Sequence, residues 1–183
     1  LCTMFTASQD DRLLAGRNLD WELPETPAIV ECAPKDGQRY LQVGFGWSAG
    51  VFTGMNEAGL VLCLEHVDGL GEPELRDAPL EFVLRDLLAS KTTAADAVDA
   101  LKALKGQHGH HVLVAGPGAN GFESNVVEFG KEVAVRAPED GVLLGVSPSN
   151  ESADADSLVR HARVADLLAT NAKHDVEALQ KVL

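Results

Sequence analysis

The sequence predicts an α+β fold in which sheets pack against each other and helices form the outer layers. Three observations predict it: a β-rich opening, a pair of amphipathic helices near the middle, and a helical final part that follows a second group of strands. This order of strands, two helices, strands and two helices is typical of an α+β architecture. No repeat, linker or low-complexity stretch interrupts the chain, so we expect a single domain over residues 1–183.

The first third of the chain is expected to form strands joined by turns. Its apolar and β-branched stretches are separated by polar, Gly and Pro positions, which favours strands. A polar turn at residues 9–11 joins the first two stretches and predicts a β-hairpin. The expected strands cover residues 2–8, 13–21, 28–33, 39–45 and 60–67.

Two helices are expected next. Over residues 79–90 the apolar side chains recur at i, i+3, i+4, i+7 and i+8, the spacing that lines one face of a helix. A second helix is expected from about residue 94 to residue 104. Thr93 with Asp96 three residues later resembles a capping box at its start, and Gly106 is expected to end it.

Strands and then helices return in the second half. Apolar residues at helical spacing predict one helix around residues 158–169 and another from residue 176 onward. Because the last apolar stripe runs to the final residue, we expect the chain to be incomplete at its C-terminus. Before these helices, Gly-rich and Asp-Gly turns separate four expected strands at residues 111–115, 125–129, 133–137 and 142–146.

Composition and charge are those of an ordinary globular protein, with 45% hydrophobic and 23% charged residues. The 28 acidic and 15 basic residues give a formal charge of −13, which argues against nucleic-acid binding. The apolar runs are far shorter than the roughly 20 residues of a membrane-spanning helix, so we expect a soluble chain with no membrane span. Few cysteines fit a reducing cytoplasm, but export with a cleaved leader would leave the same mature chain, so the localisation stays open.

Two motifs resemble ligand sites but lack the required context. Residues 116–121 satisfy G-x-G-x-x-G, yet a strand is expected after them, so we interpret them as a hairpin loop. His108, His110 and His111 cluster, but neighbouring histidines on a strand face opposite sides, and no nearby Cys or carboxylate completes a zinc site. The acidic stretch at residues 154–156 is interpreted as favourable charge at a helix start. We therefore expect no cofactor and no metal.

The three cysteines differ in their surroundings. Cys32 and Cys63 lie in strand-like apolar runs that are typical of inert buried thiols, whereas Cys2 opens the chain. If the first hairpin forms, Arg17 and Asp20 approach Cys2. A cation such as Arg17 favours the nucleophilic thiolate, and Asp20 can orient an amine beside it. An edge cysteine beside a surface ion pair is the alternative that these residues leave open.

Four motifs then follow in the order of a known family. The chain has Cys-Thr at residues 2–3, Gly-Arg-Asn-x-Asp at residues 16–20, Asn-Glu-x-Gly at residues 56–59 and Arg-His-x-Arg at residues 160–163. This pattern resembles the N-terminal nucleophile hydrolases that cut linear amides, namely choloylglycine hydrolases, penicillin V acylases and penicillin-forming acyltransferases. The last motif is more similar to the acyltransferase branch.

The resemblance implies a four-layer αββα fold and an enzyme with a cysteine nucleophile. Cys2 would attack a linear amide of an N-acylated small molecule, with its own α-amino group as base, and form a thioester acyl-enzyme. Asp20 would hold the amino group and Arg17 would balance the charge. Asn18 and the turn at residues 55–57 would position the strands. Hydrolysis and acyl transfer both fit, and a homo-oligomer is compatible with either.

Some features depart from the family pattern. Leu1 precedes Cys2, so no free α-amine exists while this peptide bond is intact, and the chain resembles a precursor. Where the family has oxyanion-hole amides, the chain carries other residues at 63–66 and 145–148, and the family continues with further strands beyond the last residue given. The remaining candidates for oxyanion and substrate contacts are His66, Ser147 and Asn150.

Alternatives to the enzyme therefore stay open. A non-catalytic or unprocessed family member would act as a scaffold or precursor. A nucleotide-binding module would require a helix after Gly121. The acyl group itself leaves no readable motif, although aromatic residues near strand ends suit an apolar acyl pocket. These aromatic candidates are Trp21, Phe45, Trp47 and Phe52.

Overall fold

The computed structural model describes residues 2–9, 11–20, 26–67, 78–105, 107, 109–145, 155–170 and 175–182. The helices are α1 (Leu80–Ser90), α2 (Ala94–Lys102), α3 (Ala155–Thr170) and α4 (Val176–Gln180). The strands are β1 (Cys2–Gln9), β2 (Arg12–Leu19), β3 (Ala28–Cys32), β4 (Tyr40–Gly44), β5 (Thr53–Asn56), β6 (Val61–His66), β7 (His110–Gly118), β8 (Gly121–Phe129), β9 (Val133–Arg136) and β10 (Val142–Leu144).

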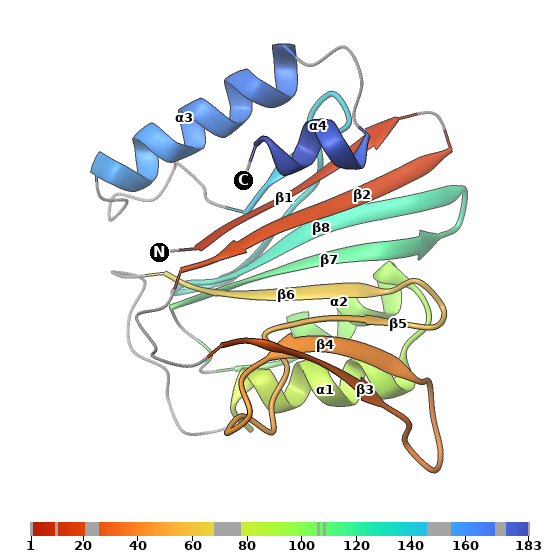
Figure 1. Cartoon of the computed structure of the whole chain (residues 1–183). Helices are drawn as coiled ribbons and strands as arrows, with labels where there is room; N and C mark the ends of the chain where they lie inside the picture. The colour runs from red at the N-terminus through yellow and green to blue at the C-terminus, as the bar shows by residue number, and fades with distance from the viewer. Residues whose placement is uncertain are drawn as a thin grey trace.

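These elements form four layers, as predicted. Three strands pair in the order β10-β1-β2, and seven pair in the order β3-β4-β5-β6-β7-β8-β9. All the pairings are antiparallel. Helices α3 and α4 cover the outer face of the smaller sheet, and α1 and α2 cover the outer face of the larger one (Figure 1). The αββα order is therefore confirmed.

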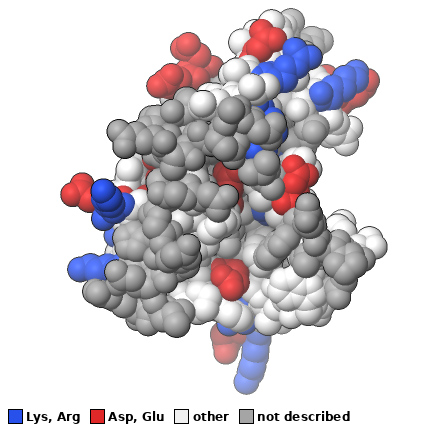
Figure 2. Space-filling model, turned by 90° about the vertical axis from the view of Figure 1, so that its left-hand side faces the viewer, with Lys and Arg blue, Asp and Glu red and all other residues white. Residues whose placement is uncertain are grey.

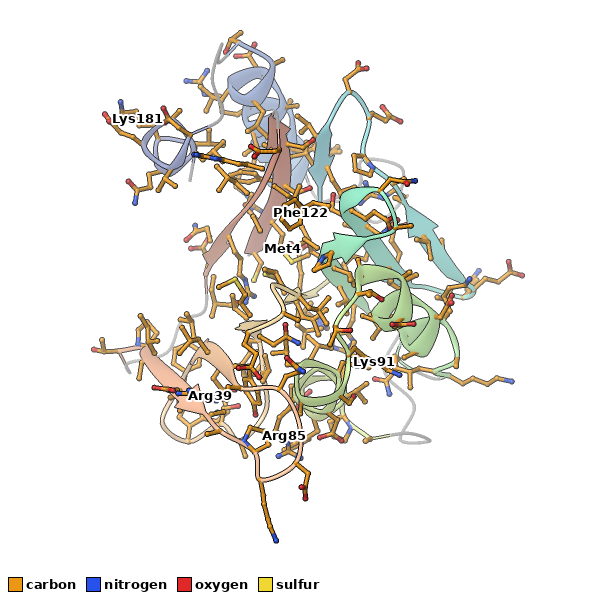
Figure 3. The ribbon with its side chains drawn as sticks, turned by 90° about the vertical axis from the view of Figure 1, so that its right-hand side faces the viewer. Met4, Arg39, Arg85, Lys91, Phe122 and Lys181 are labelled. Atoms are coloured by element: carbon orange, nitrogen blue, oxygen red, sulfur yellow. The ribbon has the colours of Figure 1, made fainter. Side chains whose placement is uncertain are left out.

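Three apolar clusters hold the layers together. Successive side chains of a strand point to opposite faces, so β1 directs Met4 toward the larger sheet and Phe5 toward the helices. Met4 packs with Cys63 and Leu113 between the two sheets, and Figure 3 shows it in that middle layer. Phe5 packs with Leu168 under α3 and α4. A third cluster joins α1 and α2 to the larger sheet.

The helix starts follow local signals. The Thr93 hydroxyl accepts a hydrogen bond from the backbone N–H of Asp96 at 3.2 Å, so the predicted cap of α2 is confirmed. Helix α2 ends at Lys102, two residues before the expected end, while Gly106 lies outside the described residues. The Asp175 carboxylate caps α4 by accepting a hydrogen bond from the Ala178 N–H at 2.9 Å.

The prediction of a turn at residues 55–57 was wrong in part. Met55 and Asn56 end strand β5, which pairs with β4 and β6, and the turn begins only after Asn56. This strand has four residues and contains Gly54, so it lacks a readable alternation. A Cβ at position 54 would lie 2.5 Å from the Leu88 Cδ1 atom, so glycine lets α1 approach the sheet.

Asn56 links the sheet to helix α1. Its side-chain amide donates to the backbone oxygens of Leu88 and Lys91 at 2.9 and 2.7 Å, and its oxygen accepts from the Leu60 N–H at 2.9 Å. The side chain is buried, so these three bonds satisfy a group that would otherwise be costly to bury. Asn56 therefore anchors the helix that borders the cleft described below.

The glycine-rich stretch at residues 116–121 is a hairpin, as predicted. Gly118 pairs with Gly121 across a two-residue turn, and strand β8 follows directly. A helix N-terminus that could face a pyrophosphate is therefore absent at this place, which excludes the nucleotide-binding alternative. Among the helices of the described residues, none combines the length and apolar character needed to cross a membrane.

Candidate active site

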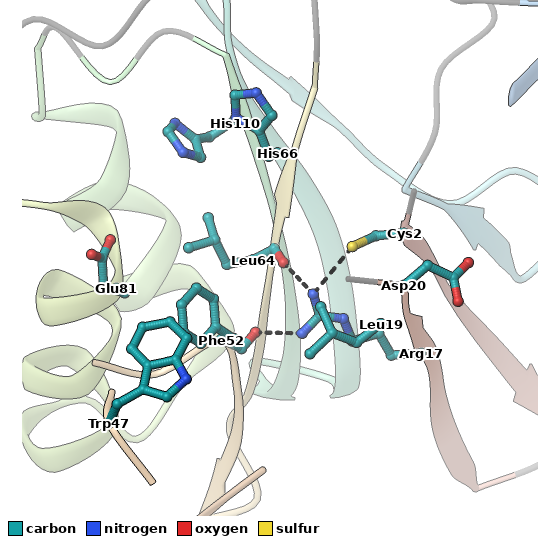
Figure 4. Close-up of a pocket in the computed structure, with 10 residues that line it drawn as sticks. All are labelled: Cys2, Arg17, Leu19, Asp20, Trp47, Phe52, Leu64, His66, Glu81 and His110. Carbon is teal, nitrogen blue, oxygen red and sulfur yellow. Dashed lines mark hydrogen bonds between the residues drawn. The ribbon is translucent and has the colours of Figure 1, made fainter. Parts of the chain in front are cut away.

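The first hairpin brings Cys2 and Arg17 together. Cys2 pairs with Leu19 and Met4 with Arg17, so all four side chains lie on the face of the smaller sheet that looks toward the larger one. The Arg17 Nη2 atom donates a hydrogen bond to the Cys2 Sγ atom over 3.6 Å (Figure 4). The predicted neighbourhood of thiol and guanidinium is therefore present in the structure.

Arg17 also joins the two sheets. Its guanidinium donates to the backbone oxygen of Phe52 at 2.9 Å, to the backbone oxygen of Leu64 at 2.6 Å and to the Thr53 hydroxyl. Phe52 directly precedes β5, Thr53 is the first residue of β5, and Leu64 lies on β6 of the larger sheet, whereas Arg17 itself lies on β2. The two terminal nitrogens therefore hold the edge of the guanidinium against the larger sheet, while Nη2 also donates to the thiol.

Asp20 follows the end of β2 at the border of the same cleft. The Asn18 side-chain amide donates to the Asp20 carboxylate at 3.0 Å. Asn18 thus contributes more than strand positioning, because it also restrains this carboxylate. Asp20 lines the cleft together with Cys2 and Arg17, so the structure brings the three residues singled out in the sequence to one place.

The cleft has a volume of about 510 Å³, a size suited to a small molecule. His66 lines it, whereas Ser147 and Asn150 lie outside the described residues. Phe45 stacks on the Trp47 ring at a centroid distance of 5.7 Å without lining the cleft itself, and Trp21 lies outside the described residues. The lining residues are Cys2, Arg17, Leu19, Asp20, Trp47, Phe52, Leu64, His66, Glu81 and His110.

Arg160 on α3 contacts the start of the chain, which the sequence did not indicate. Its Nη1 atom donates to the backbone oxygen of Cys2 at 3.2 Å and to the Thr3 hydroxyl at 3.3 Å. The motif at residues 160–163 drew attention to this arginine only through its resemblance to a family, without a role. Its partners are more than 150 residues away in the chain, so no local pattern could reveal the contact.

The neighbouring histidines His110 and His111 point to opposite faces of the sheet, as their alternation on a strand predicts. His66 and His110 are paired across β6 and β7, and their rings meet edge to face at 5.4 Å beside the cleft. His111 points to the other face, between the sheets, and His108 lies outside the described residues. The described part of the chain contains no group of three His, Cys, Asp or Glu side chains placed to hold a metal ion.

The other two thiols are unlike Cys2. Cys63 is buried between the sheets, and this burial raises its pKa from 9.0 to about 11, so it stays protonated near pH 7. Cys32 is partly exposed, contrary to the prediction of a buried thiol, because β3 is the edge strand of the described larger sheet. Cys2 alone of the three lines the cleft.

A row of polar side chains is buried between the sheets next to the site. Glu65, His111 and Glu128 are cross-strand neighbours on β6, β7 and β8. The Arg136 Nε atom donates to Glu128 at 2.5 Å, and the His111 Nδ1 atom lies 3.1 Å from the backbone oxygen of Gly145. Within the described residues, one oxygen of Glu65 and the Nε2 atom of His111 have no hydrogen-bond partner.

Burial shifts two groups of this row, Glu65 and His111, toward their neutral forms. It raises the pKa of Glu65 from 4.5 to about 7, although the nearby cations Arg17 and Arg160 oppose the shift. It lowers the pKa of His111 from 6.5 to about 4, although Glu128 opposes this shift. Because His111 is neutral near pH 7, its 4.0 Å approach to Glu65 is not an ion pair there.

These shifts predict how stability depends on pH. Glu65 binds its proton more tightly in the folded state. Its contribution to the free energy of unfolding is therefore complete below pH 4.5 and is lost as the pH rises to about 7. For Glu65→Gln we therefore expect the free energy of unfolding, relative to wild type, to rise by ~3 kcal/mol across this range. Urea unfolding at closely spaced pH values measures this difference.

His111→Gln supplies the matched comparison with the opposite sign. His111 binds its proton less tightly in the folded state. Its contribution to the free energy of unfolding is therefore present above pH 6.5 and is lost as the pH falls to about 4. Relative to wild type, this variant should lose stability as the pH rises from 4 to 6.5. Parallel stability curves for the wild type and both variants would show that the two groups are not shifted.

The fold and the site together define the class of protein. Two facing antiparallel sheets between helical layers, with strand β1 beginning at a cleft, are the architecture of the N-terminal nucleophile hydrolases. The family model for acyl-coenzyme A:6-aminopenicillanic acid acyl-transferase matches residues 6–182. The chain belongs to this family, and so to a group of enzymes that hydrolyse amide C–N bonds or transfer acyl groups to nitrogen.

Solved structures of this class share the fold at low sequence identity. A Caenorhabditis elegans ortholog of N-acylethanolamine-hydrolyzing acid amidase is 19% identical with a TM-score of 0.77, over 100% of this chain and 85% of that one. Conjugated bile acid hydrolase from Clostridium perfringens is 21% identical with a TM-score of 0.58, over 95% of this chain and 60% of that one.

Penicillin V acylase from Agrobacterium tumefaciens is more distant in sequence. It is 14% identical with a TM-score of 0.55, over 93% of this chain and 58% of that one. The chain thus spans less than two thirds of the bile acid hydrolase and of the acylase. No curated protein matches the chain. At these identities the likeness shows the fold, and substrates do not follow from it.

Proposed function

We propose that the protein is a cysteine-dependent amidohydrolase or acyltransferase that cleaves the linear amide bond of an N-acylated small molecule. One observation carries the proposal: the Cys2 Sγ atom lines a cleft of about 510 Å³ and accepts a hydrogen bond from Arg17. A thiol at a small-molecule cleft, beside a guanidinium, is placed for nucleophilic attack. The membership in a family of amidases and acyltransferases supports the same reading.

The reaction needs a free amine on Cys2, which cleavage of the Leu1–Cys2 peptide bond provides. The α-amino group, with an ordinary pKa of about 8, accepts the thiol proton as the sulfur attacks the amide carbonyl carbon. A C–S bond forms and the carbonyl oxygen becomes an oxyanion. When the oxyanion collapses, the C–N bond breaks and the leaving amine takes the proton, which leaves a thioester on Cys2.

The second half of the reaction releases the acyl group. A water molecule, or a second amine, attacks the thioester carbonyl and gives up a proton to the α-amino group. The C–S bond then breaks, the thiol is restored, and a carboxylic acid or a new amide leaves. Which of the two nucleophiles arrives decides between hydrolysis and acyl transfer.

The remaining residues have supporting roles in this proposal. Asp20 holds the α-amino group, and Arg17 balances the charge of the thiolate. The oxyanion needs donors, for which His66, Ser147 and Asn150 stay the candidates. Removal of one such donor typically lowers the rate about 100-fold to 1,000-fold, so single substitutions would rank them. His66 has the support of lining the cleft beside Cys2.

Intact-mass spectrometry tests the proposed function. The protein from its native source should lack Leu1, should gain the mass of one acyl group on the Cys2 peptide when mixed with N-acyl amides, and should react with iodoacetamide at Cys2 before Cys32 and Cys63. A protein that retains Leu1, forms no acyl-enzyme and leaves Cys2 unlabelled would instead be the non-catalytic or precursor form.

A further inference from the structure

The wall of the cleft opposite Cys2 is apolar and ends in an acidic side chain. Leu64, Phe52 and Trp47 line it, and Glu81 from the first turn of α1 lies beside Trp47 on the side away from Cys2 (Figure 4). An extended molecule with its amide at the thiol would run along this wall. Its far end would then meet the Glu81 carboxylate.

The loop next to α1 packs tightly against Glu81. The Val51 N–H donates to the backbone oxygen of Glu81 at 2.8 Å. A Cβ at position 50 would lie 2.3 Å from the Glu81 Cγ atom, so Gly50 is needed for the loop to pass this side chain. The close packing limits the directions that the Glu81 side chain can take, and the side chain lines the cleft.

Among the described residues, the Glu81 carboxylate has no hydrogen-bond donor and no cationic partner. Arg85 follows one turn later on α1, but its guanidinium contacts the Asp86 carboxylate and the backbone oxygen of Ala49, and lies over the Phe82 ring. The nearest cation of the helix is thus engaged elsewhere.

The described side chains around the far end of the cleft would not favour an anionic end group on the substrate. Arg17 is the one Lys or Arg among its described lining residues, and both terminal nitrogens of its guanidinium already donate to acceptors of the protein. Asp20 and Glu81 add negative charge, and the whole chain has a formal charge of −13. Figure 2 views the molecule from the left-hand side of Figure 1. In this view the described Lys and Arg side chains lie mostly around the outline of the molecule.

We propose that Glu81 selects substrates whose acyl group carries an ammonium at its far end. The acyl chain lies along Leu64 and Phe52, and the ammonium meets the Glu81 carboxylate at the end of this wall. A carboxylate favours a cation, and the apolar wall favours the methylenes before it. This inference rests on the proposed function and specifies its substrate class.

A matched set of substrates tests the selection. Aminocoumarin amides with unbranched acyl chains of four to eight carbons, ending in methyl, ammonium or carboxylate, differ only at the far end. At the best chain length we expect kcat/KM for the ammonium to exceed that for the methyl about tenfold, with the carboxylate lowest, since a hydrogen-bonded charge pair at a half-exposed site stabilises binding by about that factor.

Variants of Glu81 should change this preference. Glu81→Gln should bring the ammonium-to-methyl ratio close to one, and Glu81→Lys should favour the carboxylate over the ammonium. Asp99→Asn is the control, because Asp99 is an exposed acid of α2 that does not line the cleft, and it should keep the wild-type ratio. Ratios measured in one preparation are independent of the folded fraction.

Binding separates a failure of this inference from a failure of the proposed function. Calorimetry with the Cys2→Ala variant measures the affinity for the same three end groups without turnover. Equal affinities at every chain length, or an unchanged preference in Glu81→Gln, would overturn the role of Glu81 even if the amides are cleaved. If none of the three amides is cleaved but the one that ends in an ammonium binds best, the role of Glu81 is supported and the proposed amide cleavage is refuted.

Discussion

Replacement of Cys2 by alanine is expected to lower kcat toward N-acyl amides about 10,000-fold or more, because the group that forms the thioester is lost. The free energy of unfolding should change by less than about 1 kcal/mol, since the thiol is only partly buried and receives one long hydrogen bond. Fluorescence assays with aminocoumarin amides and urea unfolding measure the two quantities on the same preparation.

Cys32→Ala is the matched control for the loss of a thiol. Cys32 is also partly buried, but it lies on β3 and does not line the cleft, so its variant should keep the wild-type rate. Turnover that survives in Cys2→Ala would refute Cys2 as the nucleophile. A large fall in stability for Cys2→Ala would make the lost activity a consequence of unfolding and would also count against the prediction.

Arg17→Ala should have the second largest effect, and it should act on both activity and stability. The guanidinium supplies the donors for the backbone oxygens of Phe52 and Leu64 and for the Cys2 thiol. Without it these partly buried oxygens lose a donor, which we expect to cost ~3 kcal/mol of unfolding free energy. The rate should fall about 1,000-fold or more, as for loss of a group that acts on the reacting atoms.

Two comparisons separate the causes of this loss. Arg39→Ala removes an arginine from an exposed ion pair with Glu31, where both side chains are more than half exposed, and should change the stability by less than about 1 kcal/mol. Arg17→Lys keeps the charge but not the fork, and should recover part of the stability while leaving the rate low. Full activity in Arg17→Lys would show that charge alone is needed.

The sequence predicts those elements whose signals are local. The apolar spacing of α1 and the Thr93 cap of α2 act within a turn or two of helix, and both are confirmed. The β1-β2 hairpin follows from alternating stretches around a short polar turn, and its pairing places Arg17 beside Cys2. Strand β5 was missed, since four residues with a glycine give no periodicity that distinguishes a strand from a turn.

The cleft itself depends on contacts that no local pattern contains. Arg160 reaches the backbone of Cys2 from 158 residues away, and Glu81 reads in the sequence as an ordinary acidic residue of a first helical turn. The shifted pKa values of Glu65 and His111 arise from burial between two sheets. Each of these features exists only because the two sheets and the helices pack together in the folded structure.

The α+β class, the order of the strands and helices apart from β5, and the approach of Arg17 to Cys2 were predicted from the sequence alone, because periodicity, helix caps and a short hairpin turn act between near neighbours in the chain. Tertiary structure alone decided which side chains share the cleft and which charges are buried. Packing sets both by joining segments that are remote in sequence, and burial then changes the free energy of every charge enclosed.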